Sequence, residues 1–295
     1  MENESINFMC NTSYCRPPAN IEWLMCPNNC SVDEAVNISI GAENLDITNS
    51  IGFSSAISDL DYRLDRSENG WTIHCSASNL IANEVVSRKI KLNVMYPPIG
   101  PPVIHGVSHH NTYRVIENNQ GFLSCSMTGG NPLPDLVWIC FESDSTEVTN
   151  DTTITTSISW KAKRGQNKSC ECRSEHIGGN QSVNVYLDVL YPPEKPILMI
   201  SSVRVNKTVN KIINTSLVIH CKSRSNPAPD YIWTMPDSTT SKGDEVNIIQ
   251  ITMSNNGTYY CRAENTMISS SGKEEIGLSE TSIDILILCM CYMFF

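Results

Sequence analysis

The sequence predicts an all-β protein built from three similar domains, and three observations lead to this fold class. Short segments with alternating apolar residues recur along the 295 residues, which is the period of a strand with one buried face. No stretch keeps apolar residues at i, i+3, i+4 and i+7 over the length of a helix. A cysteine, a tryptophan twelve or thirteen residues later and a second cysteine occur three times, as Cys10/Trp23/Cys75, Cys125/Trp138/Cys172 and Cys221/Trp233/Cys261.

The third copy of this pattern is the clearest. Tyr259 stands two residues before Cys261, and Asn255 and Gly257 mark the turn that leads into the same strand. This arrangement resembles the immunoglobulin superfamily, in which a disulfide joins strands B and F, a strand-C tryptophan packs on it and a tyrosine corner precedes the second cysteine. The resemblance covers nearly the whole chain. It implies disulfides Cys10–Cys75, Cys125–Cys172 and Cys221–Cys261, core tryptophans Trp23, Trp138 and Trp233, and a tyrosine corner at Tyr259.

The first copy carries a finer signal in the turn before Cys75. Arg66, Asn69 and Gly70 resemble the variant found in nephrin-like, hemicentin-like and CD22-like adhesion receptors. Ile73 stands where the tyrosine would be, so no tyrosine corner is expected there. The domains are expected at residues 1–95, 99–190 and 194–288, followed by an apolar C-terminal stub at 289–295.

The strands follow in order from alternation and turn residues. In the first copy we expect strand B at 5–10, C at 20–25, C′ or D at 41–50, E at 58–64 and G at 88–94. In the second copy we expect B at 121–127, the B–C loop and C at 129–140, D or E at 152–160 and G at 182–189. In the third copy we expect D or E at 245–253 and G at 282–288, which makes 267–280 an unusually long F–G loop.

The domain joints share a Tyr-Pro-Pro segment, at Tyr96-Pro97-Pro98 and Tyr191-Pro192-Pro193. Two successive prolines fix φ and favour an extended segment, so neighbouring domains are expected end to end with limited bending. The simpler interpretation, that these residues only end a strand, requires the same geometry.

Cysteine and sequon content indicates an oxidising, extracellular compartment. The 13 cysteines are too many for a reduced cytosolic protein that binds no metal. The net charge of −10, without a basic run, excludes nucleic-acid binding. N-glycosylation sequons of the N-x-S/T type occur at Asn3, Asn11, Asn29, Asn37, Asn150, Asn167, Asn180, Asn206, Asn214 and Asn256.

The N-terminus gives no signal peptide, because MENESINFMC has neither a basic nor an apolar region. Cys10 also leaves no room for the A strand that precedes the same cysteine in the other copies. We therefore expect the native start to lie upstream and the protein to be secreted or surface-bound.

Seven cysteines lie outside the three framework pairs: Cys15, Cys26, Cys30, Cys140, Cys170, Cys289 and Cys291. If Trp138 lies opposite Cys172, two steps along each strand place Cys140 opposite Cys170, which predicts a second disulfide in that domain. Cys26–Cys30 is expected to close a hairpin. Cys15 is free, paired with an upstream cysteine or linked to another chain, and the sequence assigns no pairing to Cys289 or Cys291. A zinc site of Cys10, Cys15, Cys26 and Cys30 is a remote alternative, because its spacing is loose and Cys10 is the available partner of Cys75.

No catalytic site or cofactor is predicted, since the sequence lacks nucleophile-elbow, phosphate-loop, dinucleotide and zinc-protease motifs. His74 and His220 precede framework cysteines and are expected to face solvent. His105, His109 and His110 are too close along one strand to meet at a metal without a sharp fold.

The C-terminal run from Ile285 to Phe295 is apolar but shorter than the ~20 residues that a membrane helix needs. It allows three interpretations: strand G running into a truncated end, the start of a membrane helix, or the tail of a lipid-anchor signal with Ser270, Ser271 and Gly272 at the attachment site. Strand G is favoured, because a lipid-anchor signal would remove it from the mature domain.

The resemblance implies an extracellular adhesion or recognition protein that binds a protein partner, itself or a related surface protein, and performs no catalysis. Leu80, Ile81, Val85 and Val86 in the first F–G region are a candidate apolar patch; alternatively, two of them belong to the core. A secreted immune-type protein that binds microbial or glycan ligands is the first rival, and a metal-binding protein or enzyme is the second.

Overall fold

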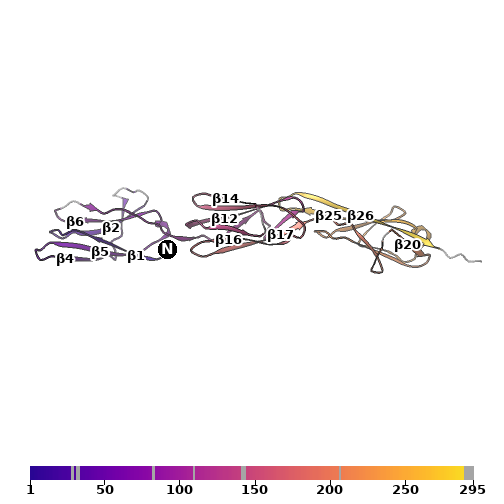
Figure 1. Cartoon of the computed structure of the whole chain (residues 1–295), viewed down its shortest axis with the longest axis horizontal. Coiled ribbons are helices and arrows are strands. Elements are labelled where there is room, and N and C mark those ends of the chain that lie inside the picture. Colours follow the sequence, from indigo (N-terminus) through magenta and orange to yellow (C-terminus); the bar gives the residue numbers. More distant parts are fainter. Residues whose placement is uncertain are drawn as a thin grey trace, which may run out of the picture.

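The computed structural model describes residues 1–27, 30, 34–81, 84–108, 110–140, 144–205 and 207–288. Its regular structure in this part of the chain is almost entirely β-strand, in three two-sheet sandwiches that follow one another along the long axis (Figure 1). Asn29, His109, Asn206, Cys289, Cys291 and the expected stub at 289–295 lie outside the described residues.

The first sandwich has one sheet in the order β1-β5-β4 and a second in the order β3-β2-β6-β7, with β8 also paired to β6. Its strands are β1 (Ser5–Asn11), β2 (Asn20–Cys26), β3 (Val36–Asn37), β4 (Glu43–Thr48), β5 (Ser54–Arg63), β6 (Thr72–Ser78), β7 (Val85–Val86) and β8 (Ile90–Lys91). Of the expected G strand at 88–94 only the short piece β8 is present, and β7 lies just before it. Leu60 and Leu64 lie in the core, and Tyr62 donates a hydrogen bond to Glu68 at 2.6 Å. Burial and this carboxylate raise the pKa of Tyr62 to about 12.

The second sandwich pairs a sheet in the order β10-β12-β15-β14 with a sheet in the order β11-β17-β16-β13. Its strands are β9 (Tyr96–Pro98), β10 (Val103–His105), β11 (Thr112–Ile116), β12 (Gln120–Asn131), β13 (Asp135–Ile139), β14 (Asp144–Thr149), β15 (Thr153–Lys161), β16 (Lys168–Glu175) and β17 (Gln181–Leu190). β9, the first Tyr-Pro-Pro segment, pairs with the end of β12.

The third sandwich pairs β19-β18-β21-β24 with β20-β26-β25-β22-β23. Its strands are β18 (Ile197–Ile200), β19 (Val203–Val205), β20 (Lys207–Ile212), β21 (Leu217–Lys222), β22 (Asp230–Thr234), β23 (Thr240–Lys242), β24 (Glu245–Ile248), β25 (Gly257–Ile268) and β26 (Glu274–Leu288). The prediction of a long F–G loop at 267–280 is wrong. β25 and β26 instead stay paired from Gly257↔Ile285 to Ile268↔Glu274, and only a short turn joins them.

Each core is built around the same pair of strands. Trp23 lies opposite Cys75, Trp138 opposite Cys172 and Trp233 opposite Cys261. Trp23 and Trp233 are buried in their clusters, whereas Trp138 is partly buried and packs against its cluster from the side. This shared register places all three tryptophans beside framework cysteines, as the repeated spacing predicts.

Candidate recognition surface and interdomain joints

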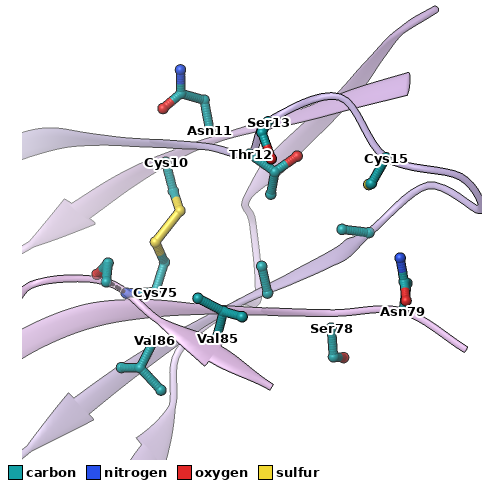
Figure 2. Close-up of a pocket in the computed structure, with 13 residues that line it drawn as sticks. Cys10, Asn11, Thr12, Ser13, Cys15, Cys75, Ser78, Asn79, Val85 and Val86 are labelled. Atoms are coloured by element: carbon teal, nitrogen blue, oxygen red, sulfur yellow. Dashed lines mark hydrogen bonds between the residues drawn. A yellow bond between two sulfur atoms is a disulfide. The ribbon is translucent and has the colours of Figure 1, made fainter. Parts of the chain in front are cut away.

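A cleft of about 340 Å³ opens in the side of the first sandwich, between β1 with its following loop and strands β6 and β7. The disulfide between Cys10 and Cys75 forms part of its wall, and Val85 and Val86 of β7 are among its lining residues (Figure 2). A second hollow continues along β1, between Phe8 on one side and the 87–91 segment on the other.

In the described residues of the other two sandwiches, an additional strand pairs with the corresponding framework strand. β10 pairs with β12 and places Ile104 opposite Cys125; β18 pairs with β21 and places Leu198 opposite Cys221. Both apolar side chains are buried. Within the described residues β1 pairs with β5 alone, so nothing equivalent covers Cys10.

Val85 and Val86 line the cleft, and Leu80 and Ile81 directly follow its lining residue Asn79 in the chain; these four apolar residues form the apolar rim of the first sandwich. Leu80, Ile81, Val85 and Val86 are 95%, 80%, 67% and 43% exposed. The alternative that two of them belong to the core is therefore wrong. Aliphatic groups gathered at one edge of a sandwich are the usual chemistry of a protein-binding surface.

His74 is buried, with only 4% of its surface exposed, so the expectation that it faces solvent is wrong. It lies on the sheet face opposite to Cys75, and its Nδ1 has no hydrogen-bond partner. Burial, with a smaller contribution from Lys89, lowers the pKa of His74, while Glu84 opposes the shift. His220, in contrast, is partly exposed and lies 3.3 Å from Glu245.

The first and second sandwiches are joined through Asn131, at the end of β12. Its side-chain amide donates to the carbonyl oxygen of Val94 at 2.7 Å and to Oδ1 of Asn93 at 2.8 Å. The guanidinium of Arg66 lies over the ring of Tyr96, 5.3 Å from its centroid. Asn131 of the second sandwich and Arg66 of the first thus both hold the chain at the Tyr-Pro-Pro segment.

The second joint repeats this construction. The amide of Asn226 donates to the carbonyl oxygen of Val189 at 2.9 Å and to Asp188 at 2.7 Å. Arg164 lies 4.2 Å from the ring centroid of Tyr191 and bonds to Glu117 and Glu194, both at 2.8 Å. Both asparagines precede a cis proline within an Asn-Pro-x-Pro-Asp sequence.

The β25–β26 hairpin adds a brace that the first joint lacks among the described residues. Met267 is buried with Ile116 and Leu190 of the second sandwich in a small separate cluster. At the tip, the main-chain N–H of Ser270 donates to the carbonyl oxygen of Arg114 at 2.9 Å. The tip of this hairpin rests on the neighbouring domain. It includes or borders the residues considered for lipid attachment, Ser270, Ser271 and Gly272.

The structure joins five cysteine pairs: Cys10–Cys75, Cys26–Cys30, Cys125–Cys172, Cys140–Cys170 and Cys221–Cys261. Cys15 is free, and its backbone bridges to Ser54. Three of the four cysteines of the considered zinc site are thus in disulfides, Cys10 with Cys75 and Cys26 with Cys30, and the described residues hold no cluster of three or more metal-ligating groups. The tyrosine-corner geometry is present at Tyr259, whose hydroxyl donates to the carbonyl oxygen of Asn255 at 3.0 Å.

The sequon asparagines in the described part of the chain are all exposed: Asn3, Asn11, Asn37, Asn150, Asn167, Asn180, Asn214 and Asn256. Their positions leave room for glycans on each sandwich. No helix of the described residues has the length and apolar character needed to cross a membrane.

Comparison with known proteins shows what the chain is similar to. Residues 195–265 match the immunoglobulin domain model. The cell adhesion molecule CEACAM16 of Rattus norvegicus is 34% identical over 116 residues, covering 38% of this chain and 27% of that protein. Cell adhesion molecule 2 of Homo sapiens is 25% identical over 213 residues, covering 66% of this chain and 47% of that protein. The chain thus spans about half the length, or less, of these relatives.

Solved structures support the fold across the whole chain. The I-band fragment I67–I69 of titin superposes with a TM-score of 0.58 at 16% identity, covering 97% of this chain and 94% of the fragment. The full three-domain ectodomain of mouse nectin-like molecule 4 superposes with a TM-score of 0.52 at 15% identity, covering 97% of this chain and 96% of the ectodomain. Together with the repeated framework, these matches show that the chain has the fold of tandem immunoglobulin-like sandwiches, and that its residues 195–265 match the immunoglobulin domain.

Proposed function

We propose that this chain is the recognition part of an extracellular cell-adhesion protein that binds other proteins. The adhesion molecules matched above and the non-enzymatic families to which they belong support this role. Binding would rely on surface complementarity, through apolar and hydrogen-bonded contacts. The disulfides and exposed sequons favour the cell surface or the extracellular space.

The observation that carries the proposal is the combination of a braced rod with an apolar rim on its first sandwich. The two joints hold the sandwiches in line, so the first sandwich is carried away from the third (Figure 1). Leu80 and Ile81 lie on that outer sandwich and are almost fully exposed. A rigid spacer with apolar groups at its end suits contact between two surfaces.

The experiment is a cell-binding assay with the chain fused to a dimeric carrier. Leu80→Asp combined with Ile81→Asp should reduce binding at least tenfold, because burying either carboxylate in an apolar contact is unfavourable. The matched control is Ile249→Asp, an equally exposed position of the third sandwich at 85%, which should bind normally. Protease treatment of the target cells should abolish binding. Loss of binding after removal of cell-surface glycans instead would favour the rival glycan-recognition function.

A further inference from the structure

We propose that the joint between the first and second sandwiches is a pH-sensitive hinge governed by His176, and that it loosens in mildly acidic solution. This inference goes beyond the proposed adhesion role and does not depend on it. It starts from one position that the two joints share but fill with different residues. His176 in the second sandwich and Asn265 in the third each lie four residues after the second framework cysteine of their domain.

Asn265 holds the second joint with a group that does not titrate. Its side-chain amide donates to the carbonyl oxygens of Tyr191 and Pro227, both at 3.0 Å. Tyr191 belongs to the linker between the sandwiches and Pro227 to the B–C loop of the third sandwich, so one side chain ties the two segments together. Asn265 is buried, and an amide keeps the same charge and the same donors at every pH at which the domain is folded.

His176 makes the matching contact at the first joint with an imidazole. Its Nε2 lies 3.0 Å from the carbonyl oxygen of Pro132, the counterpart of Pro227, and its Nδ1 lies 2.9 Å from the main-chain nitrogen of Gly178. A carbonyl oxygen only accepts a hydrogen bond, and a main-chain N–H only donates one. The ring in this arrangement is therefore neutral, with its proton on Nε2 and the lone pair of Nδ1 facing Gly178.

Gly178 connects this ring to the linker. A Cβ at Gly178 would lie 2.9 Å from Cβ of Pro97 and 3.1 Å from the imidazole Nδ1, so the absence of a side chain lets the F–G loop lie against both. The second joint repeats the packing, since a Cβ at Gly277 would lie 2.7 Å from Cβ of Pro192 and 2.5 Å from Oδ1 of Asn265. The two joints thus share one construction, and the titratable ring is the difference between them.

Protonation of the ring would break the Nδ1 contact. An imidazolium carries a proton on both nitrogens, so Nδ1–H would face the N–H of Gly178, while the bond to Pro132 could persist. The docked loop excludes the charged ring, and a released loop accepts it. The contact is therefore present at neutral pH and lost as the pH falls through the range of about 8 to 5 in which histidine gains its proton. Pro97 then loses its support, and Asn131 and Arg66 remain to hold the joint.

The segments that surround the ring contain no titratable side chain that could replace this contact. They are the linker residues 97–102, the B–C segment 129–134 and the F–G residues 177–180. The imidazole also takes part in none of the ion pairs within 4.0 Å in the described part of the chain.

The nearest charged groups on the neighbouring elements are directed elsewhere. Glu175, on the same strand as the imidazole, and Asp135, opposite it on β13, are exposed on the outer face of the sheet. By alternation along the strand, the imidazole lies on the other face. Across the joint, the guanidinium of Arg66 bonds to the carboxylate of Glu2 and lies over the ring of Tyr96. The pH response of this joint thus depends on the imidazole itself.

The test is small-angle X-ray scattering from the full chain at about pH 7.5 and about pH 5.5, on either side of the range in which histidine usually titrates. The distribution of molecular lengths of the parent chain should broaden at the lower pH. His176→Asn places the residue of the second joint at the first, so its distribution should be the same at both pH values. His105→Gln is the matched control: His105 is exposed on the same sandwich beside Ser126, and this variant should respond as the parent does.

A parent distribution that does not change with pH, or an equal change in His176→Asn, would overturn the proposal. His74 is present in all three chains, so its effect on the first sandwich is common to them and does not enter the comparison.

Nitrogen-15 NMR of the parent chain tests the state of the ring without any substitution. At about pH 7.5 the Nδ1 of His176 should give the signal of an unprotonated nitrogen and Nε2 that of a protonated one. Nδ1 should then gain its proton over the same pH range in which the lengths broaden. A proton on Nδ1 at the higher pH, or protonation of the ring without any change in the lengths, would contradict the switch.

Discussion

The side-chain amide of Asn226 donates to the main-chain carbonyl oxygen of Val189 at 2.9 Å, across the boundary between the second and third sandwiches. Asn131 makes the same bond to Val94 at 2.7 Å across the preceding boundary. Each acceptor lies two residues before the linker tyrosine, Tyr191 or Tyr96. The chain therefore uses one design twice to hold its domains in line.

Asn226→Ala should loosen the second joint without unfolding either neighbouring sandwich. The substitution removes the bonds to Val189 and Asp188, and lost hydrogen bonds of this kind cost on the order of 1 kcal/mol each. Small-angle X-ray scattering should show a broader distribution of molecular lengths. Asn210→Ala, at an exposed position of β20, is the control and should scatter like the parent. Identical scattering from both variants would mean that the β25–β26 brace and the contacts of Arg164 fix the joint without Asn226.

Tyr259→Phe should destabilise the third sandwich by about 1 kcal/mol, because it removes the hydroxyl bond to the carbonyl oxygen of Asn255 and leaves that acceptor without its partner. The neighbouring residue offers a matched control. Tyr260 is 43% exposed, and Tyr260→Phe should change stability by less than about half of this amount. Urea unfolding of both variants measures the difference, and equal midpoints would count against a tyrosine corner at Tyr259.

Replacing Cys140 and Cys170 together by alanine should destabilise the second sandwich by about 2–4 kcal/mol, the range typical of a lost disulfide. The Cys125–Cys172 bond remains in this variant, so the sandwich should still fold and be secreted. Thermal unfolding gives the magnitude. Peptide mapping of the parent under non-reducing conditions provides an independent check, because recovery of both thiols in alkylated form would remove the basis of the prediction.

The sequence predicted the parts of this fold that depend on strand period and cysteine spacing. Trp138 lies opposite Cys172 because alternation and the framework cysteines together leave one register for strands C and F. The Asn-Pro-x-Pro-Asp loops were also visible, at Asn131 and Asn226. The role of these loops in joining the domains could not be predicted from the sequence. The acceptors at Val94 and Val189 are main-chain carbonyl oxygens of another domain, and such atoms are present at every residue whatever its type.

The long β25–β26 hairpin was missed for a related reason. Residues 267–280 are rich in serine, glycine and glutamate, which predict a loop. Docking on the second sandwich, through Met267 against Ile116 and Leu190, allows these residues to continue the ladder. The burial of His74 was missed because its neighbours in the F–G region, including Glu84, lie close to it only after folding.

His74 makes the stability of the first sandwich depend on pH. Burial holds the pKa of His74 below the value of about 6.5 that an exposed imidazole has in the unfolded chain. In the window below about 6.5 the unfolded state therefore binds more protons than the folded state, and stability falls as pH decreases. Lowering the pH from about 7.5 to about 5.5 should reduce the urea midpoint of the first sandwich, followed through the indole resonance of Trp23.

His74→Gln should remove this dependence over the same pH range, since glutamine does not titrate there. Its absolute stability can differ from that of the parent without affecting the test, because the slope with pH is the quantity compared. His220→Gln is the control: His220 lies in the third sandwich, so the pH response of the first should persist. If the slope of the first sandwich survives in His74→Gln, other groups cause it. The pKa values of carboxylates such as Glu2 and Asp65 lie below their ordinary values, so these groups titrate at more acidic pH.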